Sequence, residues 1–462
     1  MATTSPLSSL SGAVGGSSTT GSGLGQGINV QQFVEYAVAN QTAAITALQT
    51  QQTTLGSQTG EIATITSDLA ALGTAAAALS DPLGALSSEA ATSSNSAAVT
   101  ATASGIATAG AHTVTVANLA TTSSFYSDEV ATSSTSLGTG DTIDISVGGK
   151  SVSSISVTSA NNTLDQLATA INLSTSAVQA SVINDANGAR LAIVSTTSGA
   201  PGNVGVTGSL HLANATAINF HQASAGLNAN LTVDGIPIAS TSNTVSNAIN
   251  GVTLNLTGPT AVGSPVSLTV APDTAQATTA INALVTAYNT VVTEINGQFK
   301  VAADGTGGGV LESDNTLREV QNSLLSAVSN SISGNNGIVN LASIGVNLQD
   351  DGTLSVDSGA LASALSSNYA SVQNLLQNST TGLSQNFSQV ISSITGPGNG
   401  LLTVDAASIA STTSGLTSQI SDMQAALAAQ ELNLTSVYST VNATLQELPL
   451  LESQMTQQLA AI

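Results

Sequence analysis

The chain of 462 residues contains no cysteine. A disulfide framework and a thiolate metal site are therefore both excluded. If the protein is secreted, its stability must come from packing and from association between subunits. A chain without disulfides can also be kept unfolded while it passes through a narrow channel.

Charged residues are scarce, and almost all of them are acidic. They make up 6% of the sequence, against about 25% in an ordinary soluble domain. The 26 acidic residues outnumber 4 basic residues, which gives a formal net charge of −22. Four scattered cations cannot neutralise a phosphate backbone, so we expect no nucleic acid as a partner. An anionic membrane surface should repel the chain, and we attribute the acidity mainly to solubility.

Aromatic residues and targeting segments are also sparse. Aromatics account for 2% of the chain against 41% hydrophobic residues in total, so the cores must rest on many small aliphatic contacts. The N-terminus lacks a basic segment followed by an apolar one, so we expect no cleaved signal peptide. We find no apolar run long enough to span a bilayer and expect no membrane insertion. Residues 1–20 are rich in Ser, Thr and Gly and are expected to be disordered.

Motifs for catalysis and cofactor binding are missing. The glycine-rich segments 21–27 and 305–309 have neither the spacing nor the Lys-Ser/Thr of a nucleotide-binding loop. His112, His211 and His221 lie in separate segments without metal-ligand spacing. Because a single histidine is far more often structural than catalytic, we expect no enzyme activity, no cofactor and no bound metal.

Both ends of the chain carry long apolar stripes with helical spacing. The N-terminal stripe has a seven-residue repeat with Gln41 as a gap, and it consists of Val34, Leu48, Leu55, Ile62 and Leu69. Its companion positions are Ala37, Ala44, Ile65, Leu72 and Leu79. The C-terminal stripe keeps the same repeat without a gap through Ile420, Leu427, Leu434, Val441, Leu448, Met455 and Ile462. We therefore expect a helix at each end of the chain.

These stripes have an ordinary interpretation, because most of them are simply the buried face of a helix. In this chain the repeat continues to the last residue, so the C-terminal helix must find a partner. The partner is either the N-terminal helix or another subunit, and we interpret both stripes as coiled-coil and oligomerisation residues. Asp81-Pro82 should end the first helix, and Pro449 should kink the second.

Between the ends, apolar and polar residues alternate with the period of a β-strand. Segments 113–116, 142–147, 191–194, 231–233, 236–238, 252–256 and 266–270 are predicted strands, with a hairpin turn at Gly148-Gly149 and a further turn at Asn187-Gly188. A short helix is predicted for 162–172. Helical spacing then returns in 281–295, ending at Asn296-Gly297, and in 317–332 and 361–376.

Three segments resemble the flagellar filament cap family, also called flagellar hook-associated protein 2. The N-terminal Gly21-Ser22-Gly23-Leu24 is similar to the entry to the family's first helix. Two further groups of residues resemble the family's V-D-G … S-N-T-I … I-x-G-V-T-L … A-Y-N and I-G-I … D-G-T-L-x-x-D segments. They comprise Val233, Asp234, Gly235, Asn243, Gly251, Val252, Thr253, Leu254, Tyr288, Asn289, Gly345, Asp351, Gly352, Leu354 and Asp357.

The resemblance implies an α+β multidomain fold in which the chain ends meet and β-rich head domains are inserted between them. After the N-terminal residues 1–20, it implies a coiled-coil leg domain from 21–42 plus 432–462 and a helical domain from 43–97 plus 274–431. A β-rich head domain is expected from 98–135 plus 225–273. A second one, from 136–224, is expected to be inserted in the first.

The resemblance also implies a function by assembly. Members form a ring-like homo-oligomer, commonly a pentamer, at the distal end of the bacterial flagellar filament, outside the cell. They promote folding and insertion of exported flagellin. Their partners are further copies of themselves, flagellin, the flagellar type III export apparatus and its chaperone. Some members adhere to host mucus, which makes mucus glycans a candidate partner.

Two alternatives stay open from the residues alone. The first is another flagellar axial protein, either a flagellin or a hook-filament junction protein. The second is an acidic surface adhesin. Loss of a cap should release unpolymerised flagellin, and an adhesin need not close into a small ring.

Overall fold

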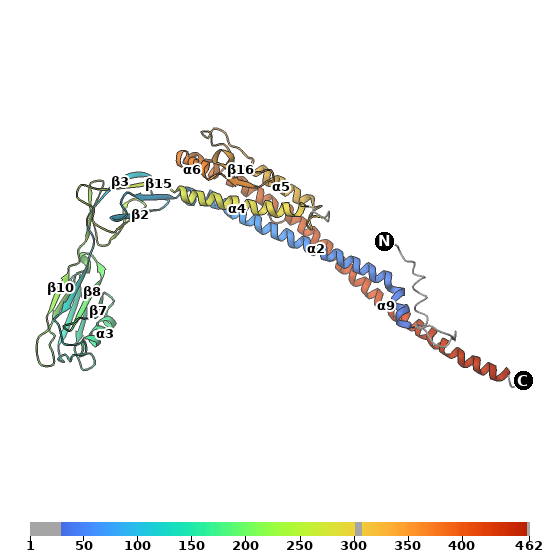
Figure 1. The fold of residues 1–462 in the computed structure, drawn as a ribbon, viewed down its shortest axis with the longest axis horizontal. Helices are drawn as coiled ribbons and strands as arrows, with labels where there is room; N and C mark the ends of the chain where they lie inside the picture. Colours follow the sequence, from blue (N-terminus) through green and yellow to red (C-terminus); the bar gives the residue numbers. More distant parts are fainter. Residues whose placement is uncertain (1–28, 301–306, 460–462) are drawn as a thin grey trace. The chain divides into compact units, whose positions relative to one another are not determined.

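The computed structural model describes residues 29–300 and 307–459, and within them it has an α+β fold (Figure 1). The chain divides into two compact units. The helical unit comprises Met1–Ala77, Asn282–Leu361 and Asn378–Ile462, and the β unit comprises Ala78–Ile281 and Ala362–Gln377. The chain thus leaves the helical unit, builds most of the β unit and returns, which confirms the predicted class of fold.

Some predictions fall outside this description or go further than it. The expected disorder of residues 1–20 and the family-like segment 21–24 lie outside the described residues. The division into a leg domain, a helical domain and two separate head domains, with the residue boundaries given above, remains a prediction.

The helical unit is built around the two long terminal helices. Helix α2 is Val30–Ser80 and α9 is Leu401–Leu459. Both sequences are rich in Ala, Leu and Gln, which favour helices. Helix α2 ends before Asp81-Pro82, as predicted, because proline lacks the N–H that would continue the ladder. Helix α9 begins earlier than its stripe and continues through Pro449 without interruption.

In the part of the chain that the structure describes, five shorter α-helices accompany the two long ones outside the β-rich segment. They are α4 Thr274–Phe299, α5 Asn315–Val328, α6 Ser358–Ser367, α7 Tyr369–Gln377 and α8 Leu383–Thr395, accompanied by the small hairpin β16 Val346–Leu348 and β17 Leu354–Val356. Three predictions need correction. Helix α4 runs past Gly297, α5 ends at Val328 and not at 332, and the segment 361–376 is divided at Asn368 into α6 and α7. Helix α8 was not predicted.

The first part of the β unit contains two antiparallel sheets. A five-stranded sheet has the order β1-β15-β3-β11-β12, and a three-stranded sheet has the order β13-β14-β2. The strands are β1 Glu89–Ser93, β2 Val99–Ala103, β3 Gly110–Asn118, β11 Ala229–Val233, β12 Ile236–Ser240, β13 Thr244–Ile249, β14 Val252–Leu256 and β15 Val266–Pro272. They enclose a shared core that includes Val114, Leu231, Leu254 and Leu268.

The second part of the β unit has its own core. A four-stranded sheet has the order β10-β4-β8-β7, and a three-stranded sheet has the order β6-β5-β9. The elements are β4 Thr122–Ser127, β5 Thr142–Val147, β6 Lys150–Ser156, α3 Leu164–Ser174, β7 Val178–Asn184, β8 Ala189–Ser198, β9 Val204–Gly208 and β10 Phe220–Ser224. Leu164, Leu167 and Ile171 of α3 are fully buried in this core, which confirms the predicted short helix and its apolar face.

One expectation about membranes is corrected. By length and composition, the helical stretch Val30–Ser87 is apolar enough to cross a bilayer, and 33% of its most apolar window is buried. The sequence contains no continuous run of large apolar residues there, because its hydropathy comes from interspersed alanines. Such a helix is weak evidence for membrane insertion, since the core helix of a soluble protein has the same composition.

Candidate functional site

The two terminal helices lie side by side and antiparallel within the helical unit (Figure 1). The rings of Phe33 and Tyr438 have centroids 5.6 Å apart. Further along α2, Gln41 Nε2 donates to Gln430 Oε1 at 3.0 Å, and Gln52 Nε2 donates to Thr417 Oγ1 at 2.7 Å. Residue numbers rise along α2 while those of their partners fall along α9. The start of α2 therefore packs near the C-terminal end of α9.

The α2 stripe faces inward along most of its length. Val34, Ile62 and Leu69 are buried, and Leu48 and Leu55 are half-buried. The companion positions differ in the N-terminal half, where Ala37 and Ala44 are exposed and the next residues, Val38 and Ile45, are buried. The larger aliphatic side chain one residue later gives more apolar burial, so it takes the inward position.

The side chains of the α9 stripe become more exposed toward the C-terminal end of the helix. Ile420 is buried, and Leu427 and Leu434 are half-buried. Farther on, Val441, Leu448 and Met455 are 43%, 41% and 61% exposed. The final stripe residue, Ile462, lies outside the described residues.

Tyr438 and Leu445, which are half-buried, take the inward positions at this end. Helix α9 then extends beyond its contact with the first turn of α2 and carries further exposed side chains of Leu450, Leu451 and Leu459. The role of the stripe in association between subunits remains a prediction.

The family-like residues of the β unit hold turns and strand ends. Asp234 and Gly235 form the two-residue turn between β11 and β12. Asp234 accepts a bond from the Thr113 backbone N–H at 2.8 Å and pairs with His112 at 2.7 Å. The hydrogen bond with His112 contributes most to lowering the pKa of Asp234 below its usual value, and the bond from Thr113 acts in the same direction.

Two further residues of this segment join distant parts of the β unit. Asn243 bonds both backbone groups of Ala120, accepting from its N–H at 2.7 Å and donating to its carbonyl at 3.0 Å. Gly251 has a φ of 72°, and a Cβ there would lie 2.7 Å from the backbone N of Ala107. Val252, Thr253 and Leu254 lie in β14, with Val252 and Leu254 facing the core.

The family-like residues of the helical unit fix the β16–β17 hairpin against α4. Asn289 accepts from the Leu354 N–H at 2.7 Å and donates to the Leu354 carbonyl at 2.8 Å. Tyr288 is buried against Phe387, with ring centroids 6.2 Å apart, and burial raises its pKa to about 12.

The remaining members of this group shape turns. Asp351 accepts from the Thr353 N–H and hydroxyl, next to Gly352 in the same turn, and Asp357 accepts from the first N–H groups of α6. A Cβ on Gly345 would lie 2.7 Å from Ala360 Cβ. These contacts hold turns, strand ends and the β16–β17 hairpin in place.

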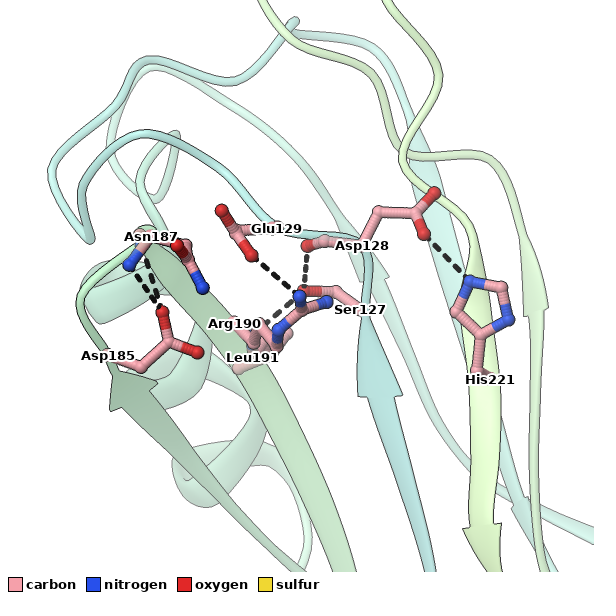
Figure 2. Close-up of polar contacts among 9 residues, drawn as sticks. Ser127, Asp128, Glu129, Asp185, Asn187, Arg190, Leu191 and His221 are labelled. Atoms are coloured by element: carbon pink, nitrogen blue, oxygen red, sulfur yellow. Dashed lines mark hydrogen bonds and ion pairs between the residues drawn. The ribbon is translucent and has the colours of Figure 1, made fainter.

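Polar side chains also connect strands in the second part of the β unit. Figure 2 shows Arg190 of β8 bonded to Glu129 at 2.6 Å and His221 of β10 bonded to Asp128 at 2.7 Å. Ser127, at the end of β4, accepts a bond from the Leu191 N–H at 2.9 Å. These contacts join three neighbouring strands. Among the described residues, no group of three His, Asp or Glu side chains could hold a metal ion.

Two family models match the chain. The model of the flagellar hook-associated protein 2 N-terminus covers residues 26–123, and that of the C-terminus covers residues 226–449. The segment between them corresponds to the second part of the β unit with its separate core.

Related proteins match most of the chain. The B-type flagellar hook-associated protein 2 of Pseudomonas aeruginosa is 30% identical over 380 residues, which are 77% of this chain and 80% of that protein. The flagellar hook-associated protein 2 of Escherichia coli strain K12 is 30% identical over 298 residues, 59% of this chain and 62% of that protein.

A solved structure agrees with the fold. The crystal structure of the flagellar cap protein FliD D1-D2-D3 domains from Escherichia coli superposes with a TM-score of 0.57 and 29% identity. The match covers 76% of this chain and 99% of that chain. Two segments match the family models, one relative is covered over 80% of its length, and the fold is shared. The chain therefore belongs to the flagellar hook-associated protein 2 family.

Proposed function

We propose that this protein is a structural, self-assembling cap at the distal end of the bacterial flagellar filament. There it promotes the folding and insertion of exported flagellin. Family membership supports the cap role, and the relative from Pseudomonas aeruginosa is matched over 80% of its length. The protein acts by presenting surfaces to its partners and performs no chemical step.

The observation that carries this proposal is the antiparallel pairing of α2 and α9, with apolar side chains continuing beyond it. Leu448, Leu451 and Met455 are 41%, 53% and 61% exposed at the end of α9. Exposed apolar side chains in such a row indicate a surface that another protein covers. Because they lie at the end of the helix pair, we assign the association surface of the cap to them.

The proposed partners follow from the cap role. The protein forms a ring-like homo-oligomer, with a pentamer favoured, since a head-to-tail interface closes into a ring when its rotation permits. Flagellin, the type III export apparatus and an export chaperone are its other partners, and host mucus glycans are a candidate for the β unit. The protein acts outside the cell at the filament tip.

The proposal can be tested by complementing a strain that lacks the gene. Wild-type protein should restore full-length filaments with label at their tips. Leu448→Asp/Met455→Asp places two charges in the exposed apolar row and should leave unpolymerised flagellin in the medium. Ser453→Asp/Gln457→Asp is the matched control, because it adds the same charge at exposed polar positions of the same helix. Full-length, tip-labelled filaments with the apolar-row variant would contradict the proposal.

The same experiment separates the alternatives. If the protein were the flagellin itself, its loss would leave no flagellin to release. If it were an adhesin, filaments would grow normally without it. Sedimentation of purified Leu434→Asp adds a direct measurement, because a charge in the half-buried stripe should weaken self-association.

A further inference from the structure

The helical unit brings acidic side chains into contact at two places. Glu61 of α2 meets Glu294 of α4, and Asp405 of α9 meets Asp314, the residue that caps the start of α5. At each place one carboxyl oxygen, Glu61 Oε1 or Asp405 Oδ2, is buried without a hydrogen-bond donor. Two ionised carboxylates can only accept bonds, so each contact lacks a proton donor unless one group is protonated.

No cation compensates these contacts. Glu294 faces Glu61 from α4, and Asp68 adds a further negative charge from α2 itself. Asp314 is the charged group that faces Asp405. Within residues 29–300 and 307–459, the helical unit carries the cations Lys300 and Arg318, and neither forms an ion pair. Arg318 instead lies over the Phe299 ring, 4.5 Å from its centroid.

The electrostatics favour a bound proton at both places. The hydrogen bond with Glu294 raises the pKa of Glu61 to about 7, and burial and the charges of Glu294 and Asp68 act in the same direction. Burial, followed by the charge and hydrogen bond of Asp314, raises the pKa of Asp405 to about 6. When two carboxyl groups share a site, one proton is retained well above the ordinary range, and the titration belongs to the pair.

We propose that each carboxyl pair holds one shared proton, and that these two protons fasten α2 to α4 and α9 to α5. With the proton present, one carboxyl O–H donates to the partner carboxylate. When the proton leaves to solvent, two negative charges face each other without a donor. The helical unit is therefore more stable in mild acid and less stable in neutral to alkaline solution.

The direction of this pH dependence follows from proton binding by the folded and the unfolded chain. The folded protein holds these protons more tightly than the unfolded chain does. The stabilisation is therefore complete below the ordinary carboxyl range and is lost as pH rises through about 6 for Asp405 and about 7 for Glu61. Because α2 and α9 also form the terminal pair, the loss acts on the two helices that the proposed assembly uses. The inference concerns folding alone and holds whether or not the protein caps a filament.

The test compares the full-length wild type with Glu61→Gln/Asp405→Asn. The amide N–H groups of the variant donate to Glu294 and Asp314 at every pH, so they replace the shared protons. For the wild type, the melting temperature followed by circular dichroism at 222 nm should fall by about 3 °C or more between mildly acidic and mildly alkaline buffer. The variant should lose most of this shift. Asp422→Asn/Glu447→Gln changes two exposed carboxyls of α9 and should keep the full shift.

A wild-type melting temperature that is the same in both buffers, or a variant that keeps the full shift, would overturn the proposal. A second measurement on the wild type does not depend on how the variant folds. In protein labelled with ¹³C at the side-chain carboxyls, the signals of one glutamate pair should titrate near pH 7 and those of one aspartate pair near pH 6. If every carboxyl titrates in its ordinary acidic range, the shared protons do not exist.

Discussion

The helical unit and the β unit use charge in opposite ways. Among the described residues, the contacts that can pair opposite charges lie in the β unit: Arg190–Glu129, and His112–Asp234, His211–Asp141 and His221–Asp128, which are ionic when the histidine is protonated. The helical unit has acidic side chains packed against each other at Glu61–Glu294 and Asp405–Asp314. It is held by apolar stripes and side-chain amides. A chain with only 4 basic residues has therefore concentrated its charge compensation in one unit.

This difference predicts opposite responses to acid. Hydrogen bonds from Asn219 and His221 lower the pKa of Asp128, and those from His112 and Thr113 lower that of Asp234. A carboxyl with a lowered pKa stabilises the fold above its ordinary range, and the effect is lost as pH falls toward the folded value. Strong acid should weaken the β unit, whereas mild acid strengthens the helical unit.

The largest effect is expected from cavities, which test whether the two units unfold independently. Leu69 of α2 and Leu254 of β14 both have 0% exposure. Leu69→Ala and Leu254→Ala should each cost about 2–5 kcal/mol, from lost burial and the cavity left behind. In calorimetry, each variant should lower the transition of its own unit and leave the other in place. Leu432→Ala, which is 75% exposed in the wild type, is the control. A single shared transition that moves with either variant would show that the units unfold as one.

A smaller effect is expected from the side-chain amides that bond both backbone groups of a distant residue. Asn289 does this with Leu354 in the helical unit, and Asn243 does it with Ala120 in the β unit. Asn289→Asp and Asn243→Asp keep the shape but remove the donor, which should cost about 1–3 kcal/mol in chemical denaturation. The exposed Asn433→Asp should change little. If these amides are incidental, all three variants will have equal stability.

The smallest effect is expected from a single surface ion pair of the β unit. Asp128→Asn removes the charge that faces His221 and should cost below about 1 kcal/mol at neutral pH, because the pair is exposed to solvent. The cost should disappear in strong acid, where the wild-type carboxyl is itself protonated. Urea titrations at both pH values measure this. A variant whose deficit persists in strong acid would indicate a packing defect.

Local chemistry made much of the fold predictable. Asp81-Pro82 stops α2, Gly148-Gly149 joins β5 to β6, and α3 buries the predicted face. Strands β1 and β2 were missed, because Glu89–Ser93 and Val99–Ala103 consist mostly of Ala, Thr and Ser and lack an alternation of large apolar residues. Helix α8 was missed although Phe387, Ile391 and Ile394 are buried on one face.

Contacts between distant segments could not be predicted in the same way. The repeat of the C-terminal stripe correctly marks a helix, but it does not say where the partner helix ends. Tyr438 contacts Phe33 in the first turn of α2, and Val441, Leu448 and Met455 lie farther along α9 and are exposed. The pairing of Glu61 with Glu294 joins residues of two helices far apart in the sequence, and like-charged side chains give no signal of attraction.

Strands β1 and β15 pair in a register that brings the two ends of the β-rich segment together. Glu89 pairs with Pro272 and Ser93 with Leu268, so the strand that enters the first β core is hydrogen-bonded to the strand that leaves it. A module whose two ends are neighbours can be exchanged, enlarged or shortened without stretching the scaffold that carries it. Members of this family could therefore change the surface of the β unit and keep the helical unit unchanged. A protein engineer could use the same pair of strands as the junction for a grafted domain.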